Sequence, residues 1–179
     1  DVFDGVPVTC IDMAMPMVLI EARHLGKRGD ETPAELDADK KFLRRLEALR
    51  LRAGAAMGLG DVKGMVIPKP VLVSPAKAGG TLQVRYFMPH SCHRSLAITG
   101  SIGLATACVS QGSIVAQMLG DTATARLQHV RIEHPGGGID VVLSYTGENG
   151  ETIRASVVRT ARRLFSGFVY APVSQRLAG

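Results

Sequence analysis

The sequence predicts an α+β fold in which a curved, mostly antiparallel sheet wraps around one central apolar helix. Residues 95–109 carry no charged side chain, and short alternating or β-branched segments occur on both sides of them. A helix that is apolar on every side must be buried on every side, so the strands have to surround it. With 179 residues, 46% of them hydrophobic, the chain is long enough for a single domain, residues 1–179, with a mainly aliphatic core.

The segments before the apolar helix supply strands and one surface helix. Thr32 and Glu35 have the spacing of a capping box, and Asp37 is a second candidate cap. From Phe42 to Met57 apolar residues recur at helical spacing with basic residues opposite, which predicts an amphipathic helix. Alternation predicts strands at residues 6–11, 17–20, 71–74 and 82–87, with a loop at residues 64–70.

The segments after the apolar helix are mostly strand-like. Residues 127–133, 139–145 and 152–158 alternate or are β-branched, and glycine-rich turns separate them. Residues 113–119 fit either a strand or a helix, and residues 168–171 fit a short last strand. We expect these strands to complete the sheet around the helix.

The start of the apolar helix is the strongest candidate for a functional site. Residues 91–95 read Ser-Cys-His-Arg-Ser, and a helix N-terminus offers unpaired N–H groups and partial positive charge to a carboxylate or phosphate. His93 can move protons near neutral pH, and a thiol such as that of Cys92 can have a lowered pKa at a helix start. The alternative is that Cys92 packs in the core and that His93 makes only structural hydrogen bonds.

Two more positions carry side chains suited to binding an anion. His134 directly follows a predicted strand and precedes a glycine-rich turn, although an incidental surface histidine fits the same pattern. Arg159, Arg162 and Arg163 follow the last strands, and one of them could bind a carboxylate through two parallel hydrogen bonds. A solvated basic edge strand would have the same composition.

Composition limits the partners and the compartment. The net charge is +5, but the basic residues are scattered, which favours small anions over nucleic acid. The three cysteines are widely spaced, which argues against a disulfide framework or a zinc site and for a reducing, cytoplasmic location. We expect no metal site, no nucleotide-binding loop and no membrane segment. The first residue is Asp1, which indicates a processed chain or a piece of a longer one.

Four segments resemble the second half of the methylaconitate/methylitaconate isomerase and 4-oxalomesaconate tautomerase family. They are VTCIDMAMPMVLIEARHLG, CHRSLAITG, IEHPGGGIDV and VVRTARRLFSG, and together they extend over nearly the whole chain. Residues 36–62 are especially similar to the tautomerase branch. The order and spacing of the four segments make the resemblance specific, although any one of them alone would be a weak signal.

The resemblance implies a diaminopimelate-epimerase-like fold of two related halves, each a curved sheet around a central helix. The active site would lie between the halves, where both helix N-termini point at a di- or tricarboxylate, and no cofactor would be used. The family's first half, with its own helix-start cysteine and a lysine implicated in proton transfer, has no counterpart here. We therefore expect this chain to need a missing N-terminal half for catalysis. An exposed apolar face between the halves could also pair two copies as a homo-oligomer.

The resemblance also assigns candidate residues. Counted from Arg85, the helix-start proton carrier falls on His93, which is expected to be an acid/base or a carboxylate-binding group. The backbone N–H groups at Arg94 and Ser95 would bind the substrate, whereas Met15 stands where the epimerases have an asparagine, so that amide contact would be lost. The predicted site is catalytic His93 with the substrate-binding residues Cys92, Arg94, Ser95, Met15, His134 and Arg159.

The expected reaction is a 1,3-proton shift in an unsaturated polycarboxylate such as 4-oxalomesaconate, which amounts to keto–enol tautomerisation. A methylaconitate/methylitaconate Δ-isomerase is the alternative enzyme. Amino-acid racemisation fits less well, because the thiol is not at the position an epimerase requires. A stand-alone module that binds small anions is the alternative outside enzymes.

Overall fold

The structure is a computed structural model that describes residues 1–120, 127–147, 152–158, 161–168 and 170. Its strands form one eight-stranded sheet in which each strand pairs with the next along the chain. The strands are β1 (Val2–Phe3), β2 (Val6–Asp12), β3 (Pro16–Glu21), β4 (Lys69–Pro75), β5 (Leu82–Tyr86), β6 (His129–His134), β7 (Gly137–Thr146) and β8 (Thr152–Val157). All pairs are antiparallel except β3 with β4 and β5 with β6. The predicted α+β class with a mostly antiparallel sheet is confirmed.

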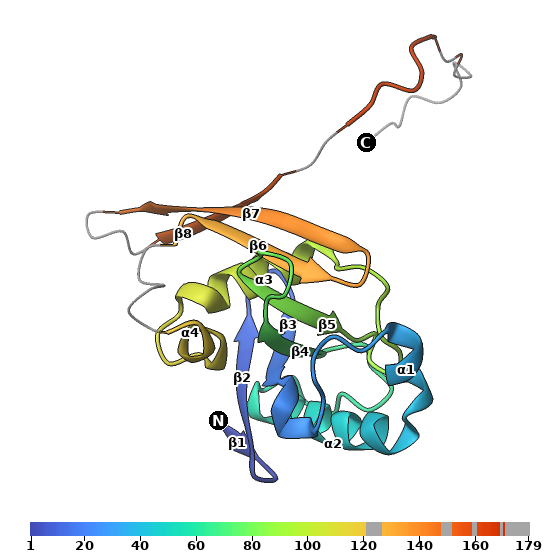
Figure 1. The fold of residues 1–179 in the computed structure, drawn as a ribbon, viewed down its shortest axis with the longest axis vertical. Helices are drawn as coiled ribbons and strands as arrows, with labels where there is room; N and C mark the ends of the chain where they lie inside the picture. The colour runs from blue at the N-terminus through green and yellow to red at the C-terminus, as the bar shows by residue number, and fades with distance from the viewer. Residues whose placement is uncertain (121–126, 148–151, 159–160, 169, 171–179) are drawn as a thin grey trace, which may run out of the picture.

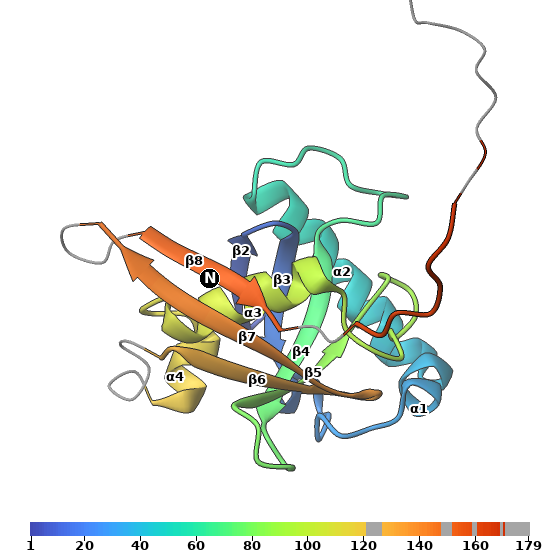
Figure 2. The ribbon, with the colours of Figure 1, turned by 90° about the horizontal axis from the view of Figure 1, so that it is seen from above.

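The sheet bends around α3 (Ile98–Val109). This helix lies between β2–β5 on one side and β6–β8 on the other (Figures 1 and 2). Eight of its twelve residues are buried, so the helix predicted to be apolar all round is confirmed. It begins at Ile98 rather than at residue 95, because Ala97 is the extended N-cap with φ −70° and ψ 143°.

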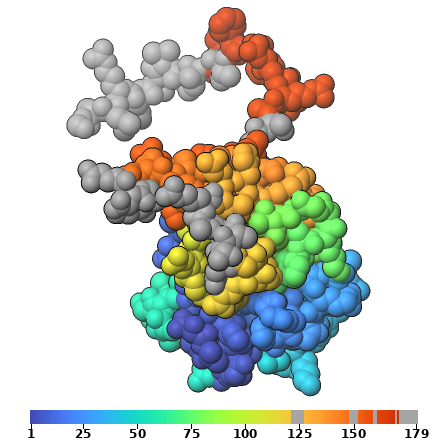
Figure 3. Space-filling model, turned by 60° about the vertical axis from the view of Figure 1, so that its left-hand side comes forward, coloured from blue at the N-terminus to red at the C-terminus, as the bar shows by residue number. Residues whose placement is uncertain are grey.

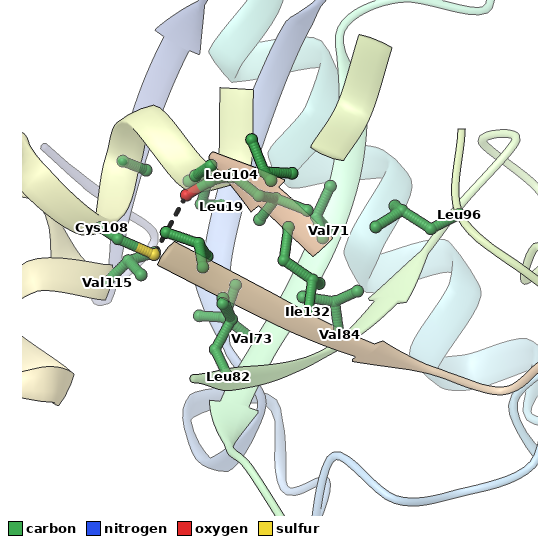
Figure 4. Packing of buried hydrophobic residues seen from close by; sticks show 14 of the residues in the cluster. Leu19, Val71, Val73, Leu82, Val84, Leu96, Leu104, Cys108, Val115 and Ile132 are labelled. Carbon is green, nitrogen blue, oxygen red and sulfur yellow. Dashed lines mark hydrogen bonds between the residues drawn. The ribbon is translucent and has the colours of Figure 1, made fainter. Parts of the chain in front are cut away.

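The inner core fills the space between α3 and the sheet. Leu104, Ala105, Ala107 and Cys108 of the helix pack here and are completely buried. Figure 4 shows Leu104 and Cys108 among side chains from four strands and from α4 (Ile114–Leu119), and it marks the bond from Cys108 Sγ to the Leu104 carbonyl at 3.3 Å. The labelled strand residues are Leu19, Val71, Val73, Leu82, Val84 and Ile132. Burial of this aliphatic surface is what holds the sheet in its curved shape.

A second cluster lies on the outer face of the sheet, under η1 (Ala22–Leu25), α1 (Pro33–Ala38) and α2 (Lys40–Ala56). The amphipathic α2 is confirmed, because Phe42, Leu46 and Leu49 point into this cluster. The capping box of Thr32 and Glu35 is also present. The helix cap predicted at residue 37 is wrong, since Asp39 caps α2 by accepting from the Phe42 N–H.

Arg50 is an exception on the buried face of α2, because its guanidinium is fully buried. It pairs with Glu47 at 2.7 Å and donates to the carbonyls of Val62 and Ile67. Each hydrogen bond therefore compensates for part of the cost of removing the charge from water. Arg50 thereby ties the segment between α2 and β4 to the helix.

Other segments resolve the remaining predictions. Residues 113–119 contain the helix α4, and β4 starts at Lys69, inside the predicted loop. The predicted last strand is not formed at Phe168, which is 95% exposed and outside the strands, and residue 171 lies outside the described residues. Residues 161–168 extend away from the rest of the chain (Figures 1 and 3). In the part of the chain that the structure describes, no helix has the length and apolar character needed to cross a membrane.

Gly100 allows the first turn of α3 to lie against Tyr86. A Cβ atom at this position would be 2.6 Å from Tyr86 Cε2, well inside a normal contact. The ring belongs to a completely packed inner core, so it has little room to move. Gly100 therefore sets the distance between the start of α3 and the end of β5.

We expect Gly100→Ala to lower the free energy of unfolding by about 1–3 kcal/mol, because the added methyl overpacks the contact with Tyr86. Helix propensity alone would raise the free energy of unfolding by about 1 kcal/mol, so the sign of the measured change separates the two effects. Urea unfolding of both proteins gives the difference. In a Tyr86→Leu background the loss should shrink; a variant as stable as the wild type would contradict the close contact.

Candidate active site

The segment between β5 and α3 carries His93, and four backbone hydrogen bonds hold it in place. The Phe87 N–H donates to the Pro70 carbonyl at 3.0 Å, and the Met88 N–H donates to the Ser91 carbonyl at 2.8 Å. The His93 N–H donates to the Tyr86 carbonyl at 2.7 Å. The fourth N–H is that of Cys92, which donates to Asp37 Oδ1 of α1 at 2.7 Å. These bonds fix His93 directly beside the end of β5.

The imidazole of His93 is half-buried and has two defined neighbours. Its Nδ1 accepts a hydrogen bond from the Ser95 N–H at 2.9 Å. Its ring meets the Tyr86 ring edge-on, with the centroids 6.2 Å apart and an interplanar angle of 86°. Since burial raises the pKa of Tyr86 to about 12, this phenol carries no charge at neutral pH. Through Tyr86 and Gly100, His93 is connected to the first turn of α3.

His134 lies at the end of β6 and close to the same place. Its Nδ1 accepts from the Gly136 N–H at 3.1 Å. The turn packs on the β5–α3 segment, since a Cβ on Gly136 would be 3.1 Å from the Arg94 carbonyl oxygen. Burial lowers the pKa of His134, and the proximity of His93 and Arg85 lowers it further. The structure therefore brings together the two histidines that the sequence places on different segments.

The start of α3 adds partial positive charge to this region. No side chain caps the helix at Ala97, and its first turn contains no acidic residue. The N–H groups of an uncapped helix start attract anions. Beside the segment between β5 and α3, a hollow is lined by Thr32, Pro33, Ala34, Asp37, Arg94 and Pro135. Asp37 contributes a carboxylate to this hollow, and its Oδ1 accepts a hydrogen bond from the Cys92 N–H.

Cys92 lies on the opposite face of the segment from His93. It pairs with Phe87 in an isolated antiparallel bridge, and both side chains belong to the outer cluster under α2. Burial raises the pKa of its thiol to about 12, which is the reverse of the lowered pKa considered for a helix-start thiol. The thiol is therefore protonated at neutral pH, and any part of Cys92 in substrate binding stays a prediction.

The remaining predicted residues occupy several places. Arg94 is exposed at the hollow. The Ser95 N–H donates to His93 Nδ1 and is therefore not free to bind a substrate. Met15 is half-buried in the turn between β2 and β3 and packs against the inner core. Arg159 lies outside the described residues. No group of three or more His, Cys, Asp or Glu suited to a metal occurs within the described ranges.

Asp37 and Tyr86 are site residues that the sequence analysis missed. The sequence predicts only a helix cap at Asp37. Its carboxylate instead accepts a hydrogen bond from the N–H of Cys92, 55 positions further along the chain. Tyr86 is only one residue within the strand predicted at residues 82–87. Neither role leaves a local signal, because both depend on contacts between segments that are distant in the chain.

Comparison with known proteins places the chain in a family. The PrpF protein family matches residues 1–172. The chain belongs to the PrpF family. It is 59% identical over 172 residues to YbhH of Escherichia coli (strain K12), covering 96% of this chain and 48% of that protein. It is 45% identical to the 4-oxalomesaconate tautomerase of Pseudomonas putida, covering 94% of this chain and 46% of the tautomerase.

A solved PrpF-like structure supports the fold. The crystal structure of methylitaconate-delta-isomerase matches with a TM-score of 0.76 and 26% identity, covering 92% of this chain and 46% of that chain. The chain spans about half the length of the curated relatives it matches. That the chain corresponds to the second of two related halves stays a prediction.

The lowered pKa of His134 predicts how stability depends on pH. The stability contributed by neutral His134 is fully present above pH 6.5, the ordinary pKa of a histidine. It is lost as the pH falls through the lower pKa of the folded state, because the unfolded chain then binds more protons than the folded chain. We expect the free energy of unfolding to rise as the pH increases from the lowered pKa of folded His134 to its ordinary value of 6.5, and His134→Gln to remove part of that rise.

Urea unfolding at several pH values measures this dependence. His129→Gln is the matched control, since His129 is exposed at the other end of β6. An unchanged pH dependence in His134→Gln, or an equal change in both variants, would contradict the burial of His134 beside positive charge.

Proposed function

We propose that this chain forms the substrate-binding half of a PrpF-family isomerase that shifts a proton within an unsaturated di- or tricarboxylate. The observation that carries the proposal is that His93 and His134 lie close together near the uncapped start of α3, with Arg94 exposed at the adjoining hollow. Such a set attracts and orients anionic groups and stabilises negative charge that develops during a reaction. A missing N-terminal half, which the family resemblance implies, would supply the other wall of the site.

The reaction has chemical requirements that this arrangement meets in part. Removal of a proton next to a carbonyl group leaves an electron pair that spreads over the conjugated system and onto oxygen. Hydrogen-bond donors aimed at that oxygen lower the barrier. The proton that the base removed is then delivered either to that oxygen, which gives the enol, or to a different carbon, which shifts the double bond. This chain offers the donors; the base would come from the first half, where the family resemblance places a cysteine and a lysine.

The most suitable substrate is a 4-oxalomesaconate-like acid, whose keto–enol tautomerisation is such a proton shift. The support is the 45% identity to the Pseudomonas putida tautomerase. The alternative substrates are methylaconitate and methylitaconate, since a solved methylitaconate-delta-isomerase shares the fold at 26% identity. A stand-alone role as an anion-binding module would need the same donors and no first half.

The test compares this chain alone with a protein in which it is joined to a family first half. We expect the joined protein to tautomerise 4-oxalomesaconate faster than it isomerises methylaconitate or methylitaconate, as followed by absorbance. The chain alone should bind these acids in calorimetry without converting them. Absence of turnover by the joined protein on all three acids would refute the isomerase proposal, and binding by the chain alone would then favour the anion-binding module.

A further inference from the structure

His93 and His134 share an uncommon local arrangement. In each, the ring nitrogen Nδ1 accepts a hydrogen bond from the backbone N–H two residues later, from Ser95 at 2.9 Å and from Gly136 at 3.1 Å. A neutral imidazole has one nitrogen that donates and one that accepts. Because Nδ1 accepts, the neutral ring carries its proton on Nε2. Both side chains therefore present an N–H group on the side of the ring away from their own backbone turn.

This arrangement leaves His93 poorly suited to accept a proton. The lone pair of Nδ1 is occupied, so protonation there would break the bond to the Ser95 N–H. A histidine that acts as a base is commonly stabilised by a carboxylate beside the ring. Among the described residues, the histidines with a carboxylate oxygen within 4.0 Å of a ring nitrogen are His24 and His90.

The acid that lines the hollow is also engaged elsewhere. Asp37 accepts a hydrogen bond from the Cys92 N–H through its Oδ1. A neutral His93 ring with its proton on Nε2 still offers a hydrogen-bond donor.

We infer that His93 is a neutral hydrogen-bond donor in catalysis and not the base, and that the Ser95 backbone N–H sets this tautomer. This inference rests on the proposed function. When the substrate C–H bond breaks, its proton goes to a base of the first half, and the electron pair moves through the conjugated system to a carbonyl oxygen. The His93 Nε2–H donates to that oxygen. The base then returns the proton either to this oxygen, where an O–H bond forms and the product is the enol, or to another carbon, where the electron pair forms a new C–H bond. No proton is lost or gained overall.

The tautomer can be tested on this chain without substrate. Nitrogen-15 NMR separates a ring nitrogen that carries a proton from one that does not. At neutral pH we expect His93 to show a protonated Nε2 and an unprotonated Nδ1. His129, which is exposed, is the internal reference for a ring without this constraint. A protonated Nδ1 on His93, in either a neutral or a charged ring, would overturn the inference.

The catalytic role is tested in the joined protein with two variants. His93→Gln keeps an N–H donor near the position of Nε2 but cannot accept a proton, whereas His93→Ala has neither property. We expect kcat of the glutamine variant to stay within about tenfold of the wild type, and the alanine variant to lose about 100–1,000-fold. The dependence of kcat on pH should be the same in the wild type and in His93→Gln.

The outcomes separate this inference from the proposed function. Equal large losses in both variants would make His93 a base, and wild-type turnover in both would remove it from catalysis; either result overturns the inference while the isomerase proposal stands. If the joined wild-type protein has no turnover, the proposed function fails. The NMR result then still decides which nitrogen of His93 carries the proton.

Discussion

The enclosure of α3 is the constraint on which the rest of this structure depends. A helix without a polar face cannot rest on one side of a flat sheet, because the other side would leave apolar surface in water. The sheet satisfies this by bending, so that β2–β5 and β6–β8 cover the helix from two sides. Curvature, strand order and the position of the candidate site all follow from covering this helix.

Because the body of α3 is buried, we expect functional groups at the start of the helix. The N–H groups of the first turn are the polar part of an otherwise apolar element, and they emerge where β5 ends and β6 turns into β7. Tyr86 and Gly100 fix the distance between helix and strand there. Two loops then bring His93 and His134 to this point, each ring oriented by the backbone that follows it. The core thus determines where anion-binding groups can gather.

Local patterns in the sequence were sufficient to predict the buried helix, most strands, the capping box and the amphipathic α2. They placed the helix start at residue 95 instead of Ile98, because the extended conformation of Ala97 depends on packing rather than on composition. Alternation along residues 92 and 93 would have shown that a thiol and an imidazole face opposite sides of an extended segment. The closeness of His93 to His134 and the bond from Cys92 to Asp37 have no local signal, since they join segments far apart in sequence.

The pairing of every strand with its successor also bears on how the chain reaches this shape. Strands next to each other in space are next to each other in sequence, so most of the sheet can grow by short steps with little loop-closure entropy. The exceptions are the two parallel joins. Between β3 and β4 the chain inserts η1, α1 and α2, and between β5 and β6 it inserts α3 and α4. Each of these pairings must wait until a long inserted segment has been placed, so they are the topologically demanding steps of folding.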